Sequence, residues 1–94
     1  MELRHLRYFV TVVEEQSLTK AAEKLFIAQP PLTRQIKKLE EELGIDLFVK
    51  GARPLKATEA GLFFYQHAVQ ILTHTAQAAS MAKKMKLVEN IVKV

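Results

Sequence analysis

Apolar residues recur at the three- and four-residue spacing of an amphipathic helix in several stretches of the chain. The first stretch predicts a helix over residues 3–15, with apolar positions Leu3, Leu6, Val10 and Val13. Ser17 has the side chain of a helix N-cap, and it predicts a second, short helix directly after it. The inner side of this short helix carries Ala21, Ala22 and Leu25.

A third helix is expected after a tight connection at residues 26–28. Pro30 and Pro31 fit a helix only in its first turn, where backbone N–H groups have no partners, and Gly44 closes it as the residue after the C-cap. Its apolar face carries Leu32, Ile36, Leu39 and Leu43.

The segment after Gly44 has the pattern of a small β-hairpin. Residues 45–50 are rich in β-branched and aromatic side chains, residues 51–54 form a turn, and residues 55–57 return as a second strand. The expected fold is therefore mainly α: a winged helix-turn-helix of three helices plus a two-stranded wing, followed by a long helix.

Thr58 is the expected N-cap of that long helix, which has no proline and continues to about Val88. Thirty residues of helix extend roughly 45 Å, more than a 60-residue globule covers. Its apolar stripe is rich in alanine, which favours a closely packed antiparallel helix from a second copy of the chain. The expected dimerisation residues are Tyr65, Ala68, Leu72, Ala76, Ala79 and Ala82. Residues 90–94 alternate weakly and are expected to begin a strand.

The polar side of the third helix carries its charges in an order that opposes the helix dipole. Basic Arg34, Lys37 and Lys38 precede the acids of residues 40–42, although each favourable placement contributes about 0.3–1 kcal/mol. A phosphate backbone at the front of the helix accounts for this order, because helix N-termini and basic side chains both bind phosphate. Ordinary surface pairs, Lys37 with Glu41 and Lys38 with Glu42, are the alternative.

Within a helix-turn-helix, these residues predict contacts with duplex DNA. Arg34 is the first candidate for a strong base or phosphate contact, Gln29 for adenine or phosphate, and Arg53 for the minor groove or a phosphate. Thr33 and Gln35 add hydrogen-bonding capacity toward bases. Nonspecific attraction is expected from Lys37, Lys38, Lys50 and Lys56, and a phosphate contact at the second helix from Ser17 and Thr19.

Five runs carry a resemblance to a known family: LRHLRYF (3–9), SLTKAA (17–22), AQPPLTRQI (28–36), LEEELGIDLF (39–48) and TEAG (58–61). Together they resemble the N-terminal domain of LysR-type transcriptional regulators over essentially the whole chain. The likeness is strongest to members that control aromatic-compound catabolism in response to muconate.

The resemblance implies that Gln29, Pro30, Pro31, Thr33 and Arg34 form the reading end of the recognition helix. It also implies that Arg53 and Pro54 form the wing tip. Thr33 stands where serine is usual, and Val49-Lys50 replaces a commoner Glu-Arg, which weakens a specific role for Lys50. Phe26 replaces a cysteine and is expected to pack inside.

The family also implies an organisation and partners. We expect a DNA-binding domain at 1–57, a dimerisation helix at 58–89, and the start of an effector-binding domain at 90–94. That domain lies outside this sequence, and a muconate-like effector would bind there, so no cofactor is expected in this chain. The expected partners are promoter DNA with inverted-repeat half-sites, a second copy through the long helix, and a tetramer in the full-length protein.

Other classes of function find less support. The chain has no cysteine, no nucleophile–base pair and no glycine-rich phosphate loop, so we do not expect an enzyme or a thiolate metal site. His67 and His74 lie on one helix face without further ligands, and we expect them at the surface or in an interface rather than on a metal. We expect a cytoplasmic protein without signal peptide or membrane span. A helical protein-interaction module that uses the long helix remains the alternative.

Overall fold

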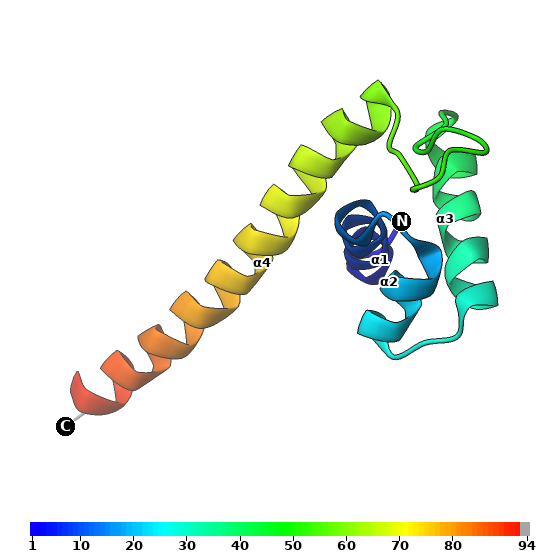
Figure 1. Ribbon diagram of the computed structural model, residues 1–94. Coiled ribbons are helices and arrows are strands. Elements are labelled where there is room, and N and C mark those ends of the chain that lie inside the picture. Colours follow the sequence, from blue (N-terminus) through cyan, green and yellow to red (C-terminus); the bar gives the residue numbers. More distant parts are fainter. Residues whose placement is uncertain (93–94) are drawn as a thin grey trace.

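The computed structural model describes residues 1–92, and these form four helices joined by short connections (Figure 1). The helices are α1 (Leu3–Glu15), α2 (Leu18–Leu25), α3 (Gln29–Leu43) and α4 (Glu59–Val92). Helices α1 to α3 form a bundle, from which α4 extends as a single rod. The molecule measures 63 × 25 × 20 Å along its principal axes.

Three helix ends follow the capping chemistry that the sequence predicts. The Ser17 hydroxyl accepts the Lys20 N–H at 3.1 Å, and the Thr58 hydroxyl accepts the Gly61 N–H at 2.9 Å. Gly44 ends α3 in the left-handed conformation, with φ of 68°. These ends fix where each helix begins and stops, which confirms the predicted boundaries of α2 and α3.

Helix α1 lies at the centre of the core, in contact with each of the other three helices. The Phe9 ring packs between Phe48 and Phe64, with ring centroids 5.6 and 5.3 Å away. The apolar face of α3 is covered as expected, since Leu32, Ile36 and Leu39 are buried. This packing fixes α3 across α1, with its polar side turned outward.

The two-stranded wing is not present within residues 1–92. A single antiparallel bridge joins Phe48 to Ala57, and the Val49 N–H donates to the Lys56 carbonyl at 2.8 Å. Neighbouring backbone groups are paired elsewhere: the Glu40 carboxylate accepts the Leu47 N–H at 2.7 Å, and the Leu55 N–H donates to the Gln16 carbonyl at 3.0 Å. The Thr58 N–H also donates to the Leu47 carbonyl at 3.0 Å, so residues 47–49 and 56–58 pair across this bridge, but among the described residues the pairing extends no further.

Helix α4 is longer than predicted and includes part of the segment that we expected to begin a strand. It continues through residues 90–92 in helical form, so the strand is wrong there; Lys93 and Val94 lie outside the described residues. No proline or glycine follows Gly61, so nothing in the sequence interrupts the helix. Its 34 residues correspond to about 51 Å.

The predicted dimerisation stripe of α4 divides into two parts. Ala68 is fully buried in the core of its own chain, Leu72 packs against that core, and the Tyr65 hydroxyl donates to Glu14 of α1 at 2.6 Å. A second copy therefore cannot cover Ala68, which its own chain already buries, whereas Tyr65 and Leu72 are covered only in part. Ala76, Ala79 and Ala82 lie beyond this contact and are exposed.

Over residues 59–91, α4 exposes eight large apolar residues, and five of them form an outer stripe along another side of the helix, whereas Leu62, Leu87 and Ile91 lie elsewhere around it. This outer stripe consists of Phe63, Ile71, Met81, Met85 and Val88. Two residues of helix turn a side chain by about 200°, so Met81 points away from Ala79. No helix within residues 1–92 has the length and apolar character needed to cross a membrane.

Candidate nucleic-acid interface

The starts of α2 and α3 and the turn at residues 52–55 converge on one groove. Its volume is about 690 Å³. The polar and basic side chains that line it are Ser17, Thr19, Lys20, Gln29 and Arg53, with Pro54 beside them. Glu15 is the acid on its rim, and the Lys24 ammonium pairs with its carboxylate at 3.3 Å. Residues far apart in sequence thus form one surface with a positive balance.

Local bonds position the two helix starts relative to each other. The Ser17 hydroxyl is occupied as an N-cap, so capping accounts for Ser17. The Thr19 hydroxyl donates to the side-chain oxygen of Gln29 at 3.1 Å, which joins the first turn of α2 to the first residue of α3. Gln29 is therefore held at the rim of the groove rather than left to rotate.

The opposite rim is the turn that carries Arg53. Gly51 adopts a φ of 78°, a left-handed conformation that favours glycine, and the Leu55 N–H bond to Gln16 anchors the turn to the end of α1. Arg53 and Pro54 are exposed on this anchored turn. A guanidinium held there faces the helix starts across the groove.

The outward side of α3 continues this surface. Pro30, Arg34, Lys37 and Lys38 are exposed, and Pro31 and Thr33 are half-buried at its edges. Neither Lys37–Glu41 nor Lys38–Glu42 forms an ion pair among the described residues, so the surface-pair alternative is not what this structure contains.

The acids at the back of α3 have structural partners instead. Glu40 accepts the Leu47 N–H, and Glu42 pairs with the Met1 amino group at 3.0 Å. The hydrogen bond from that amino group holds the pKa of the Glu42 carboxyl below its ordinary value. The basic side chains in the first part of α3 are therefore exposed, whereas Glu40 and Glu42 near its end stabilise neighbouring segments.

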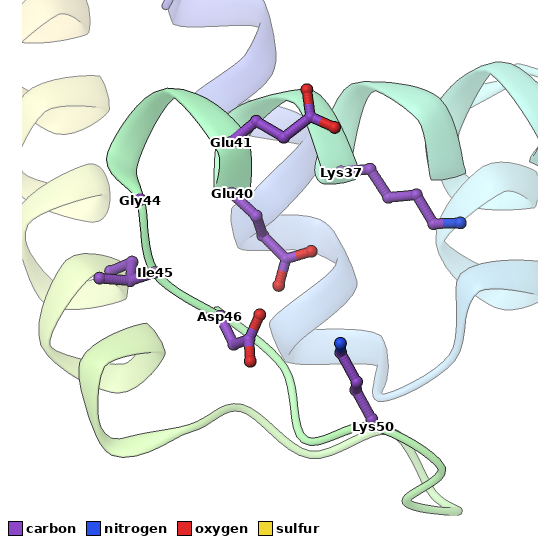
Figure 2. A pocket seen from close by; sticks show the side chains of 7 residues that line it. All are labelled: Lys37, Glu40, Glu41, Gly44, Ile45, Asp46 and Lys50. Atoms are coloured by element: carbon purple, nitrogen blue, oxygen red, sulfur yellow. The ribbon is translucent and has the colours of Figure 1, made fainter.

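None of the four predicted phosphate-attracting lysines, Lys37, Lys38, Lys50 and Lys56, lines the groove itself. Lys50 lines a second pocket of about 460 Å³ with Lys37 and three acids, Glu40, Glu41 and Asp46. Figure 2 shows the side chains of Glu40, Asp46 and Lys50 directed into the same space. An acidic surrounding disfavours a phosphate. Lys56 is exposed but does not line the groove.

Three residues depart from the sequence-based expectations. Lys20 lines the groove and was missed, although its place one residue after Thr19 was a usable signal. Gln35 turns toward α1, where its side-chain oxygen is buried without a hydrogen-bond partner among the described residues. Phe26 does not pack inside: it is 94% exposed, with a positive φ of 57° in the connection between α2 and α3.

Comparison with known proteins identifies this arrangement. Residues 3–62 match the family described as "Bacterial regulatory helix-turn-helix protein, lysR family". The chain belongs to this lysR family. The matched range covers the three-helix bundle, the groove and the start of α4.

Individual relatives agree with the family match. The chain is 61% identical over 94 residues to the HTH-type transcriptional regulator BenM of Acinetobacter baylyi, covering all of this chain and 31% of BenM. It is 57% identical over 72 residues to the regulator CatR of Pseudomonas putida, covering 77% of this chain and 25% of CatR. The chain thus spans about a third or less of these lysR-family relatives.

A solved structure matches the whole architecture. The crystal structure of a BenM_DBD/benA site 1 DNA complex superimposes with a TM-score of 0.90 at 64% identity. The match covers 92% of this chain and 97% of that one. The lysR-family fold, with four helices and an extended α4, is therefore confirmed.

Proposed function

We propose that this chain is the operator-binding part of a bacterial transcriptional regulator that recognises inverted-repeat half-sites in double-stranded DNA. Helix α3 enters the major groove with Gln29, Thr33 and Arg34 toward the bases. The turn at Arg53 reaches the minor groove or the adjoining phosphates. The observation that carries this proposal is the groove where Thr19, Lys20, Gln29 and Arg53 converge beside the exposed basic side of α3.

Charge and chemistry support this assignment of roles. Arg34 is exposed on the second turn of α3, and a guanidinium binds two acceptors of guanine at once. Lys20, Lys38 and Arg53 surround the reading end and neutralise phosphates without distinguishing sequences. The net charge of +4 favours the same polyanionic partner.

We further propose that two copies pair through the outer stripe of α4, in an antiparallel arrangement. Met81, Met85 and Val88 are 64%, 60% and 51% exposed, and they recur at helical spacing where the chain's own core no longer covers α4. A second copy carries the same stripe, which makes the contact self-complementary. Two paired copies place two recognition helices on the two half-sites.

The resemblance of the sequence extends the proposal to the whole protein. The regulated genes would encode degradation of aromatic compounds in the bacterial cytoplasm, and a muconate-like effector would bind a domain beyond this chain. Full-length copies would assemble as tetramers. The relatives named above are transcriptional regulators, which agrees with a non-enzymatic role.

Duplexes that the protein selects from a random pool provide the test of DNA recognition. Arg34→Ala should weaken binding to the selected duplex by about 1–3 kcal/mol and relax the preference at the contacted base. Lys38→Ala should weaken binding to selected and scrambled duplexes alike. It should also reduce the slope of log affinity against log salt concentration by about one. Wild-type affinity for Arg34→Ala, or binding to peptides but not to duplex DNA, would overturn the proposal.

Sedimentation of paired charge variants tests the pairing surface. Met81→Lys with Met85→Lys should abolish dimers, because four ammonium groups would be buried in the contact. Ala76→Lys with Ala79→Lys alters the predicted stripe on the other side of the helix and should leave dimers intact. The reverse result would assign pairing to the alanine stripe instead.

A further inference from the structure

The hydrogen bond between Thr19 and Gln29 determines more than the spacing of two helices. The donor is the Thr19 hydroxyl in the first turn of α2, and the acceptor is the Gln29 side-chain oxygen, 3.1 Å away. Both residues are exposed and line the groove that Arg53 closes on its other side. The bond therefore acts on a side chain that is available to a ligand.

A glutamine side chain presents different chemistry at its two ends. The oxygen accepts hydrogen bonds, whereas the amide nitrogen donates two. When a neighbour holds the oxygen, the planar amide cannot rotate freely, and its nitrogen is turned the other way. Gln29 in this state offers donors to whatever enters the groove.

Within the described residues, neither helix capping nor core packing accounts for the side chain of Thr19. Ser17 already supplies the N-cap of α2, and the exposed position of Thr19 excludes a place in the core. Threonine is also stiff at its first side-chain torsion, since two heavy atoms branch from its Cβ. Its hydroxyl is thus a well-placed partner for the Gln29 oxygen.

We infer that Thr19 is a positioning residue for base recognition: it orients Gln29 so that the amide nitrogen contacts acceptor atoms on the major-groove edge of a base. Guanine offers two such acceptors, N7 and O6, whereas thymine and adenine offer one each, and the usual paired contact with adenine also requires the amide oxygen to accept from N6. The inference replaces the expected paired contact of Gln29 with adenine by a contact through donors alone, for which guanine offers the most acceptors. It rests on the proposed function, in which Gln29 faces the bases.

Five proteins and one set of duplexes test the inference. The proteins are the wild type, Thr19→Val, Thr19→Ser and Gln29→Ala, together with the double variant Thr19→Val/Gln29→Ala. Valine keeps the shape of threonine without its donor, and serine keeps the donor. The duplexes are the selected operator and versions in which one base pair at a time is changed, including 7-deazaguanine in place of guanine.

The expected result is a loss of base preference at a specific position. Thr19→Val should reduce discrimination about fivefold at the base pair where Gln29→Ala also reduces it, as expected for one hydrogen bond. Thr19→Ser should retain the wild-type preference. In the Gln29→Ala background, Thr19→Val should have no further effect, and its salt dependence should match that of the wild type.

Other outcomes overturn the inference in distinguishable ways. A uniform loss over all duplexes with a lower salt dependence would make Thr19 a phosphate contact. An effect that persists without Gln29 would make it a structural residue, which thermal melting of each variant checks independently. A preference for cytosine, or a preference for adenine that survives replacement by 7-deazaadenine, would show that the amide oxygen faces the base. If Gln29→Ala changes binding and Thr19→Val does not, only this inference fails; if Gln29→Ala changes nothing, the proposed contact of Gln29 fails with it.

Discussion

The two halves of α4 have similar helical geometry but opposite surroundings. Up to Leu72, one side of the helix is covered by α1, and Ala68 is completely buried. Every residue from 73 to 91 is exposed. An isolated helix of this length is marginal in water, so most of its stability has to come from packing. The first half is therefore part of a folded domain, and the second half has no packing against the rest of the described chain, which is where the proposed pairing of two copies would supply it.

The same contrast separates two kinds of apolar residue. Those that face α1 serve the fold of one chain, whereas the outer stripe adds nothing to that fold and is available for association. Substitutions in the covered region should change the free energy of unfolding, and substitutions in the exposed half of α4 should change self-association only. The following predictions test that division at a fixed protein concentration, since dimerisation also contributes to apparent stability.

Phe9→Ala should have the largest effect. The ring is fully buried between Phe48 and Phe64, so its removal leaves a cavity where α1 meets α4. We expect a loss of about 3–5 kcal/mol in the free energy of unfolding, measured by urea titration with circular dichroism. Met81→Ala is the control and should change the same quantity in a monomeric background by less than about 0.5 kcal/mol. Comparable losses of unfolding free energy in Phe9→Ala and Met81→Ala would show that the exposed half of α4 contributes to the fold as much as the covered region does.

Gly61→Ala should have the next largest effect, although it adds a single carbon. A Cβ at this position would collide with the backbone carbonyl oxygen of Leu47, and backbone cannot move away as a flexible side chain can. We expect a loss of about 1–3 kcal/mol in thermal or urea unfolding. Gly44→Ala meets no atom within 4 Å but has a φ of 68°, and should cost about 1 kcal/mol through backbone strain alone. A smaller loss at Gly61 than at Gly44 would contradict the close approach of α4 to this loop.

Phe26→Gly should increase stability. Phe26 has a positive φ, which costs a residue with a Cβ roughly 1–2 kcal/mol, and its ring is almost wholly exposed, so little packing is lost. We expect a gain of about 1 kcal/mol in the free energy of unfolding. Phe26→Ala removes the ring but keeps the Cβ, and should leave stability nearly unchanged. A loss of stability in both variants would mean that the ring packs against something.

The sequence predicted the four helices because their signals are local. Ser17, Thr58 and Gly44 act within one turn of helix, and the inward faces of α1 to α3 follow from spacing alone. Outcomes that depend on partners distant in sequence were not predictable in the same way. Within residues 1–92 the wing is reduced to a single bridge, and the Glu40 carboxylate takes the Leu47 N–H that a longer ladder would use. No local pattern indicates such competition.

The candidate site was predictable in part for the same reason. The exposure of Arg34 and Lys38 follows from the helical period of α3, whereas the meeting of Thr19 with Gln29 requires the angle between two helices. The alanine stripe of α4 was assigned to a partner because spacing identifies an apolar face but does not say which chain covers it. Only the position of α1 shows that Ala68 belongs to the core of its own chain.

Tyr65→Phe should give the smallest effect, with a characteristic dependence on pH. The Tyr65 hydroxyl donates to the Glu14 carboxylate and so ties α4 to α1, and this bond raises the pKa of Tyr65 above its ordinary value of 10.0. Because the pair is partly exposed, we expect a loss of about 0.5–1 kcal/mol at neutral pH.

A group whose pKa is raised by folding stabilises the protein below its unfolded pKa, and this contribution is lost as the pH rises through the folded pKa. The difference in unfolding free energy between wild type and Tyr65→Phe should therefore stay constant from neutral pH to about pH 10 and shrink above it. Tyr8→Phe is the matched control, because the Tyr8 hydroxyl makes no hydrogen bond within residues 1–92. Equal stability of wild type and Tyr65→Phe at neutral pH would mean that Tyr65 stabilises the covered half of α4 by packing of its ring, which phenylalanine keeps, rather than by its bond to Glu14.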